Sequence, residues 1–229
     1  MFTTNAKKIK ALQKNKRDKG SETNASKKRK GKEMNNFYAM LSRMKYINRW
    51  ALMRNSYTEN ISEHSLEVSI LAHALAIIGN RRLGKNLDAD RAAVIAMFHD
   101  ATEIITGDMP TPIKYFNSDI RSAFKDIEAG AAERLLSLLP EDLREDYIPA
   151  FFPNKDDPGE AYLLKLIKAA DKLSALIKCR EEEKMGNHEF SSAGKTLYTS
   201  LIKMELPEAD IFIKEFLPAY NLTLDELQS

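Results

Sequence analysis

The sequence predicts an all-α fold, and three observations point to it. Glycine (9) and proline (8) are scarce among the 229 residues, so few positions carry the residues that mark frequent turns. Apolar side chains recur at the i, i+3, i+4 and i+7 positions of helices, and strand-like alternation is hard to find. Several of these segments begin at a capping residue and end beside glycine or proline. The length suffices for one substantial core or two small ones.

A single cysteine, Cys179, excludes an internal disulfide framework and fits a reducing compartment. The chain lacks a run of about 18 apolar residues, which a membrane span needs. Its N-terminus also lacks the short apolar segment of a secretory signal. We therefore expect a cytoplasmic protein with no membrane partner.

Charge is divided unevenly along the chain. Residues 1–33 hold twelve Lys and Arg but three Asp and Glu, a net charge of +9, whereas the remainder carries −7. With so few apolar side chains, these residues cannot offset the entropy that is lost on ordering. We expect a disordered basic extension at 1–33, followed by one domain at 34–229. The KKRK cluster at 27–30 suits weak contact with nucleic acid, but no specific nucleic-acid partner is expected.

A first helix is predicted over residues 35–47 by its apolar stripe. The next segment, residues 48–55, contains the only tryptophan of the chain, Trp50, beside Arg49. The planar fork of Arg49 suits a phosphate, and Trp50 suits a pocket wall. A loop with one exposed arginine and one core aromatic explains the same residues, and spacing alone leaves both interpretations open.

A second helix is predicted over residues 60–78. Asn60 and Glu63 have the spacing of a capping box, and Gly79 is the expected stop. His64 falls in the first turn, on the apolar face of this helix. A lone histidine there is usually a core or capping residue, so it becomes a metal ligand only if a partner packs opposite.

The third helix, predicted over residues 89–105, carries the central motif. His99 and Asp100 stand side by side at the end of an apolar run, and Glu103 is i+4 from His99. The proline-rich loop that follows adds Asp108. So many ionisable groups beside an apolar stripe are costly unless a cation or a substrate is present. The alternative is a surface helix end with solvated acids.

Further helices are predicted over residues 118–139, 143–150, 158–185, 191–205 and 207–217, with a short piece at 220–226. Asp88 and Asp157 are the expected N-caps of two helices. Asp171 falls on the buried side of 158–185, where a carboxylate needs a cation or several hydrogen-bond donors. A metal ion and a salt bridge to an arginine both remain open for it.

The order His64, His99-Asp100, Asp171 resembles that of the HD-domain superfamily of metal-dependent phosphohydrolases. Longer motifs resemble the bacterial 5′-deoxynucleotidase family, over about residues 35–225. They are Ile-Asn-Arg-Trp (47–50), Leu-Met-Arg-Asn (52–55), Thr-Glu-Asn-Ile-Ser-Glu-His-Ser-Leu (58–66), His-Asp-Ala-Thr-Glu (99–103), Gly-Asp-Met-Pro-Thr-Pro-Ile-Lys-Tyr-Phe-Asn (107–117) and Lys-Ala-Ala-Asp (168–171). The chain departs from the family in residues 1–33 and at Ala51, where the family tends to have proline.

This resemblance implies an all-α HD-domain bundle that hydrolyses deoxyribonucleoside 5′-monophosphates to deoxynucleosides and phosphate, as a homodimer. Position by position, it implies one divalent metal ion held by His64, His99, Asp100 and Asp171. Such a mixed nitrogen and oxygen set suits a transition metal rather than Ca²⁺. We expect Co²⁺ or Mn²⁺, with Zn²⁺, Ni²⁺ or Fe²⁺ as alternatives.

The resemblance also implies roles for other residues. Arg49 grips the phosphate and Trp50 helps to orient it. Glu103 and Asp108 act around the attacking water and the leaving oxygen, and spacing does not tell which does which. Contacts with the substrate are further implied for His64, Asp100, Asp108, Met109, Pro110, Thr111 and Asp171.

Two other functions stay open at this point. An HD-domain hydrolase of another phosphoester, such as guanosine tetraphosphate or a cyclic nucleotide, uses the same ligands, although the Arg49–Trp50 loop argues against it. A nucleotide- or nucleic-acid-binding module with a structural metal relies on the basic extension. The complete ligand set with spare carboxylates argues against that module.

Overall fold

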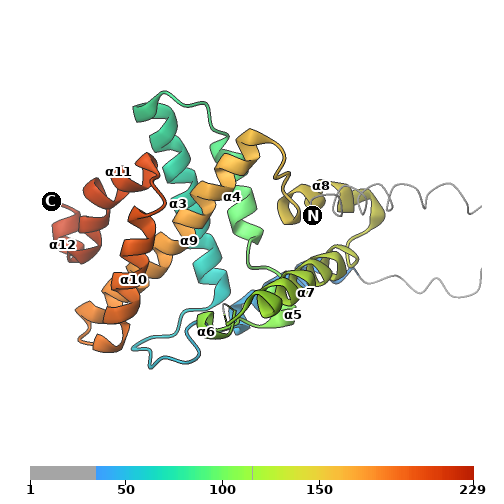
Figure 1. Ribbon diagram of the computed structural model, residues 1–229, viewed down its shortest axis with the longest axis horizontal. Coiled ribbons are helices and arrows are strands. Elements are labelled where there is room, and N and C mark those ends of the chain that lie inside the picture. The colour runs from blue at the N-terminus through green and yellow to red at the C-terminus, as the bar shows by residue number, and fades with distance from the viewer. Residues whose placement is uncertain (1–34, 115) are drawn as a thin grey trace, which may run out of the picture. The chain divides into compact units, whose positions relative to one another are not determined.

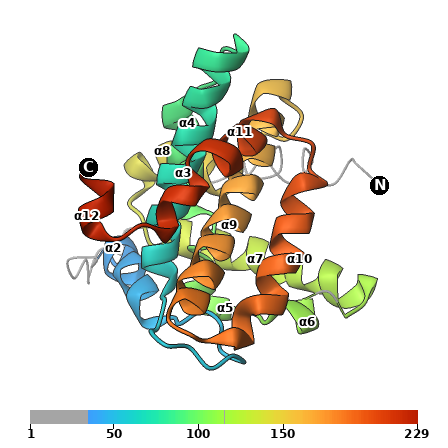
Figure 2. The same cartoon turned by 90° about the vertical axis from the view of Figure 1, so that its left-hand side faces the viewer.

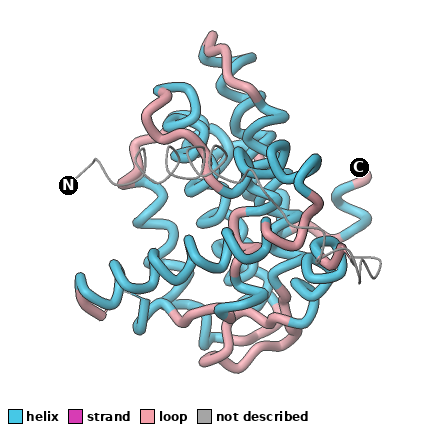
Figure 3. Tube along the Cα trace, turned by 90° about the vertical axis from the view of Figure 1, so that its right-hand side faces the viewer, coloured by secondary structure: helices cyan, strands magenta, loops and turns pink. Residues whose placement is uncertain are grey.

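The computed structural model of the protein describes residues 35–114 and 116–229, so the extension expected at 1–33 lies outside the described residues. Among the described residues the regular structure is helical, and the sole β-type pairing is an isolated bridge between Asn48 and Asn60 (Figure 3). Residues from Asn35 to Ser229 form one compact unit. The prediction of an all-α fold is confirmed.

The helices are α2 (Phe37–Leu41), η1 (Ser42–Tyr46), α3 (Ile61–Leu83), α4 (Ala89–Phe98), α5 (Glu103–Thr106), α6 (Thr111–Lys114), α7 (Ser118–Leu136), α8 (Glu141–Phe151), α9 (Pro158–Lys184), η2 (His188–Phe190), α10 (Ser191–Ile202), α11 (Pro207–Glu215), η3 (Leu217–Asn221) and α12 (Leu224–Leu227). The η elements are short 3₁₀ helices. Pro158 opens α9 behind the Asp157 cap, whose side chain accepts from Glu160 N at 2.8 Å.

Helix α3 is the centre of the core (Figures 1 and 2). It packs against α4, α9 and α11, and α9 packs in turn against α10. Val68, Leu75 and Leu173 are completely buried in this contact. Burying each such side chain contributes about 1.5–3 kcal/mol, so the helices that carry the site are also those that hold the fold together.

Helix α3 is also the described helix whose length and apolar composition would allow it to cross a membrane. More than half of its apolar window is buried inside the fold, since 56% of those residues are covered. Its contacts with α4 and α9 account for that apolar character.

The start of α3 was predicted correctly, but its end was not. Asn60 accepts from Ser62 N and Glu63 N, and Glu63 closes the capping box. The helix then runs through Gly79 to Leu83 and ends at Gly84, which has the left-handed φ of 66°. Gly79 serves packing instead, because a Cβ there would lie 2.8 Å from Leu87 Cδ1 and 2.9 Å from Glu208 Oε1.

Helix α4 ends earlier than the predicted 89–105. It begins at the expected cap, Asp88, which accepts from Arg91 N, and it stops at Phe98. After that the backbone tightens, because His99 N donates to Ala96 O and Ala101 N to Phe98 O. The His-Asp pair therefore stands in a turn, where both side chains can face the same point.

Other boundaries shift by smaller amounts. The single helix predicted over residues 35–47 is divided at Ser42, where the α-helix passes into a 3₁₀ helix. The helix predicted over 118–139 ends at Leu136, and α8 begins at Glu141, directly after Pro140. Helix ends tighten or fray locally, which periodicity does not record.

Candidate metal centre

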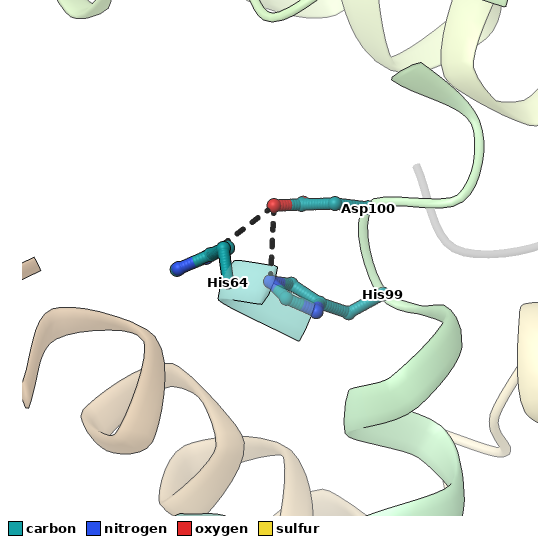
Figure 4. Close-up of side chains that lie close together, drawn as sticks. All are labelled: His64, His99 and Asp100. Carbon is teal, nitrogen blue, oxygen red and sulfur yellow. Dashed lines mark ion pairs between the residues drawn. The ribbon is translucent and has the colours of Figure 1, made fainter. Parts of the chain in front are cut away.

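Three of the predicted ligands meet where the first turn of α3 faces the end of α4 (Figure 4). His64 is completely buried. Asp100 Oδ2 lies 3.1 Å from His99 Nε2 and 3.6 Å from His64 Nε2. One ligand atom from each residue lies within 4.8 Å of the other two. Two imidazoles and a carboxylate thus converge from segments far apart in the sequence.

Asp171 reaches the same place from α9. Its Oδ1 lies 3.2 Å from His64 Nε2, and its side chain is 41% exposed. It stands outside the closest trio of ligand atoms. The structure therefore brings Asp171 to His64, and its role as a fourth ligand remains a prediction.

The hydrogen bonds of the two histidines test whether a cation fits. His99 Nδ1 lies 2.6 Å from Ala96 O, so Nδ1 carries a proton and donates to that carbonyl. Within the described part of the chain, Nε2 of His64 and Nε2 of His99 are buried without a hydrogen-bond partner. Buried nitrogens that face carboxylates are satisfied by a cation between them. These residues fit a divalent transition metal with nitrogen and oxygen ligands.

Without a cation, His99 and Asp100 compensate each other. Burial opposes protonation of His99, but the charges of Asp100 and Asp171 outweigh it and raise the pKa of His99 to about 9. Burial also opposes ionisation of Asp100, but His99 outweighs it and lowers the pKa of Asp100 well below its usual range. A proton on His99 therefore occupies the place of a cation, and metal binding has to displace it.

Two further carboxylates stand beside the trio. Glu103 is 6% exposed, and its Oε2 has no hydrogen-bond partner among the described residues. Burial, together with the charges of Asp100 and Asp108, raises the pKa of Glu103 to about 9. Burial also raises the pKa of Asp108, although Arg49 opposes the shift. Glu103 therefore holds a proton at neutral pH in the metal-free site, as a general acid requires.

Arg49 lies against the metal centre, which rules out the interpretation of an exposed arginine. Its side chain is 14% exposed, and Nη1 lies 2.7 Å from His64 Nδ1. Nη1 also donates to Glu59 Oε1 at 3.1 Å. Trp50 Nε1 donates to Glu59 Oε2 at 2.6 Å, and the indole packs edge-on against Phe190 at a centroid distance of 5.3 Å. One buried carboxylate thus holds both residues of the loop.

The rest of the predicted substrate segment follows Asp108. Met109 and Pro110 are half-buried between Gly107 and α6. Thr111 is the first residue of α6, and its side chain lies outside what the structure describes. The implied contacts of these residues with a nucleotide remain predictions.

Three polar residues beside the metal centre were missed from the sequence: Glu59, Glu67 and Ser174. Ser174 Oγ lies 3.0 Å from His64 Nδ1 and donates to Glu67 Oε2 at 2.5 Å. Ser174 is i+3 from Asp171, and Glu67 is i+3 from His64, so helical spacing could have indicated both. Glu59 precedes the helix cap in an irregular segment, where spacing carries no such signal.

Comparisons with known proteins place these observations in a family. The family described as 5′-deoxynucleotidase YfbR-like matches residues 36–220. A 5′-deoxynucleotidase of Photorhabdus laumondii is 50% identical over 194 residues, which are 85% of this chain and 97% of that protein. A 5′-deoxynucleotidase of Vibrio cholerae is 49% identical over 191 residues, which are 83% of this chain and 97% of that protein.

Solved structures show the same architecture. An HD-domain phosphohydrolase from Listeria innocua has a TM-score of 0.69 at 21% identity, over 85% of this chain and 92% of that one. The HD phosphohydrolase of cyanophage S-2L, solved with dA and one catalytic Zn²⁺ ion, has a TM-score of 0.56 at 21% identity, over 81% and 96%. At such identities the likeness concerns the fold, and it confirms the predicted HD-domain helical bundle.

Proposed function

The chain belongs to the YfbR-like family of 5′-deoxynucleotidases, and from this we propose that His64, His99, Asp100 and Asp171 hold the metal ion of its active site. The protein is a phosphoric monoester hydrolase that converts deoxyribonucleoside 5′-monophosphates to deoxynucleosides and phosphate. The observation that carries the assignment is the pair of buried Nε2 atoms of His64 and His99, which lack a hydrogen-bond partner among the described residues and face the Asp100 carboxylate.

The activity depends on a divalent metal ion, and we assign Co²⁺ or Mn²⁺ to it ahead of Zn²⁺, Ni²⁺ or Fe²⁺. Nitrogen and carboxylate ligands suit all five ions, so the choice rests on a titration. Such an ion, when bound, lowers the pKa of a water molecule and neutralises charge on a phosphate.

Arg49 binds the phosphate in this proposal. Its hydrogen bond to Glu59 uses Nη1, the atom that also lies beside His64 Nδ1, which leaves Nη2 and Nε for a bidentate contact with phosphate oxygens. Trp50 stands beside Arg49, with the guanidinium carbon 5.7 Å from the indole centroid, and orients the nucleotide. A tight fit of Trp50 against the sugar C2′ accounts for a preference for deoxyribose, and Trp50→Ala then relaxes that preference.

The proton transfer falls to Glu103 or Asp108. Glu103, whose pKa is raised by burial in the metal-free site, suits donation to the leaving 5′ oxygen, and Asp108, which is paired electrostatically with Arg49, suits the orientation of the attacking water. Glu103→Gln and Asp108→Asn separate the two roles. Loss of the general acid removes the alkaline limb of the pH–kcat profile, and loss of the base removes the acid limb.

The test is phosphate release from dAMP, AMP and 3′-dAMP with Co²⁺, Mn²⁺ or EDTA present. We expect release from dAMP alone and its abolition by EDTA. If none of the three nucleotides releases phosphate, the substrate is another phosphoester. Guanosine tetraphosphate and cyclic nucleotides are then the next substrates to test. Activity that survives complete metal removal contradicts the ligand assignment.

We further propose that the enzyme acts as a homodimer in the cytoplasm. Exposed apolar side chains follow one face of α3 and continue onto α4, where His73 Nε2 of α3 lies 3.7 Å from Asp90 Oδ1 of α4. These side chains are Leu66, Ile70, Ile77, Val94 and Met97. Light scattering after gel filtration tests the dimer, and Ile70→Glu shifts the mass to a monomer if this face forms the interface.

A further inference from the structure

Glu59 stands at an unusual place for a carboxylate. It directly precedes the Asn60 cap of α3, and it is 7% exposed. Its Oε1 accepts from Arg49 Nη1 and lies 3.6 Å from His64 Nδ1. Its Oε2 accepts from Trp50 Nε1. One buried side chain thus contacts a metal ligand, the phosphate-binding arginine and the only tryptophan of the chain.

The backbone around Glu59 closes the same loop. Arg49 N donates to Glu59 O at 2.9 Å, and Ile61 N donates to Ile47 O at 3.0 Å. Directly after Arg49, Trp50 adopts a φ of 62°, in the left-handed region that a bulky residue seldom enters. Such a conformation persists only where surrounding contacts impose it. The hydrogen bond from Trp50 Nε1 to Glu59 is one of those contacts.

We infer that Glu59 is a positioning residue, which holds Arg49 and Trp50 in register with the metal ligand His64. This role rests on the proposed function, because it explains how that site is preformed. With the carboxylate in place, the guanidinium meets the phosphate without a search among rotamers. Without it, Arg49 and Trp50 both lose their anchor, while the metal ligands keep theirs.

The first experiment follows Trp50 directly, in metal-free protein. Because Trp50 is the only tryptophan, its fluorescence reports on this loop alone. We expect Glu59→Gln to increase the acrylamide quenching constant about twofold, since Gln cannot accept from both donors as the carboxylate does. Glu59→Asp, which is too short to reach both, serves as a second variant if the first is poorly folded.

Glu208→Gln is the matched control. Glu208 is buried like Glu59, and it likewise accepts from a basic side chain, Lys85, and from an aromatic residue, the hydroxyl of Tyr162. It lies on α11, away from the site. We expect a comparable loss of thermal stability in both variants, but unchanged Trp50 quenching in Glu208→Gln. Equal quenching in wild type and Glu59→Gln overturns the inference.

The second experiment is kinetic, on the metal-loaded enzyme with dAMP. Loss of a supporting partner of a site residue typically costs about 10- to 100-fold. We expect Glu59→Gln to raise KM about tenfold, with a smaller fall in kcat, and Glu208→Gln to leave both unchanged. If Glu59 acts through Arg49, then Glu59→Gln changes KM little in an Arg49→Ala background.

The outcomes separate this inference from the assignment of function. Additive effects of the two substitutions on KM contradict the positioning role but leave the 5′-deoxynucleotidase assignment intact. Absence of dAMP hydrolysis in the wild type contradicts the assignment instead. The quenching comparison still decides whether Glu59 holds the loop, because it needs neither metal nor substrate.

Discussion

Helix α9 carries two buried polar clusters that differ in one respect. One is the candidate metal centre, beside which Asp171 and Ser174 lie. The other, the anchor cluster, comprises Lys178 and Glu182 with their partners Ser56, Tyr57 and Asn187. In the anchor cluster Lys178 Nζ donates to Tyr57 O at 2.8 Å and to Glu182, while Glu182 also accepts from Ser56 N at 2.9 Å and Asn187 Nδ2 at 2.7 Å.

Both carboxylate oxygens of Glu182 are thus satisfied, whereas the metal centre leaves three buried atoms without partners among the described residues: Nε2 of His64, Nε2 of His99 and Oε2 of Glu103. Burial of charge is common to both clusters, and Glu182 is more buried than Asp171. What distinguishes the site is incomplete hydrogen bonding. The ion pair of Lys178 and Glu182 has all its hydrogen-bond partners within the protein and holds a loop in place. The buried polar atoms of the candidate metal centre lack such partners, and a bound ligand would supply them.

The largest expected effect comes from Asp100→Ala. We expect phosphate release from dAMP to fall at least about 10³-fold, equivalent to about 4 kcal/mol of transition-state stabilisation. The metal-free protein also loses some unfolding free energy, because the charge of Asp100 raises the pKa of His99 to about 9 and so stabilises the folded state at neutral pH, but we expect it to remain folded. Phosphate assays and urea titrations measure the two quantities. If Asp100→Ala unfolds the metal-free protein, Asp100 has a structural role like that of the anchor cluster.

Glu182→Ala reverses this pattern. Removing the carboxylate leaves the Lys178 ammonium buried without its counterion, which costs about 3–5 kcal/mol of unfolding free energy. The turnover of folded enzyme changes much less, since Glu182 contacts none of the predicted ligands. Urea titration and kcat per folded molecule provide the comparison. The double variant Lys178→Met/Glu182→Leu recovers most of the loss if charge burial is the cause.

Metal addition distinguishes the clusters without any substitution. An ion that binds only the folded protein stabilises it by about 2.7 kcal/mol at a free concentration 100 times Kd. We expect this increment in thermal unfolding of the wild type and of Glu182→Ala, and none in Asp100→Ala. Equal stabilisation of all three proteins by the metal means that the ion binds elsewhere.

Ser174→Ala should affect the metal centre alone. Ser174 Oγ joins His64 Nδ1 to Glu67, so its removal frees the ring to turn. We expect metal affinity to fall about tenfold, or about 1.4 kcal/mol, in isothermal titration calorimetry. Ser69→Ala is the matched control, because Ser69 is also buried and donates to Ala93 O at 2.8 Å. Equal loss in both variants points to general loosening of the core.

Acid should weaken the anchor cluster, with no effect near neutral pH. Burial disfavours ionisation of Glu182, but donors from Lys178, Ser56 and Asn187 outweigh it and lower its pKa to about 2. A depressed pKa contributes stability above the ordinary value of 4.5 and loses it as the pH falls toward 2. The unfolding free energy of Glu182→Gln should therefore decline less than that of wild type across this interval, and parallel curves contradict the assignment.

Three of the proposed ligands, His64, His99 and Asp100, lie together in the structure, and each of them is signalled locally in the sequence. His99 and Asp100 interrupt an apolar run, and the capping box that places His64 in the first turn of α3 is a short-range pattern. Residues whose hydrogen-bond partners are distant in the sequence could not be predicted in this way. Ser56 and Glu182 lie 126 positions apart, and no local pattern announces their hydrogen bond.

Two errors in helix boundaries have the same origin. Gly79 resembles the residue that ends a helix. In the folded protein, however, the side chains of Leu87 and Glu208 pack so close to it that there is no room for a Cβ atom. The end of α4 at Phe98 depends on local tightening of hydrogen bonds, and the apolar pattern continues past it. Tertiary packing set the end of α3 and local backbone geometry set the end of α4. The spacing of apolar residues along the sequence contains neither kind of information.

The site is assembled from α3, the turn after α4 and α9, and this order constrains how the enzyme is made. A chain emerging from a ribosome presents His64, His99 and Asp100 long before residue 171 is synthesised. The nascent chain therefore lacks the fourth proposed ligand, Asp171, until α9 has joined its neighbours. Binding of an ion by all four proposed ligands therefore has to follow the packing of α9 against α3 and α4.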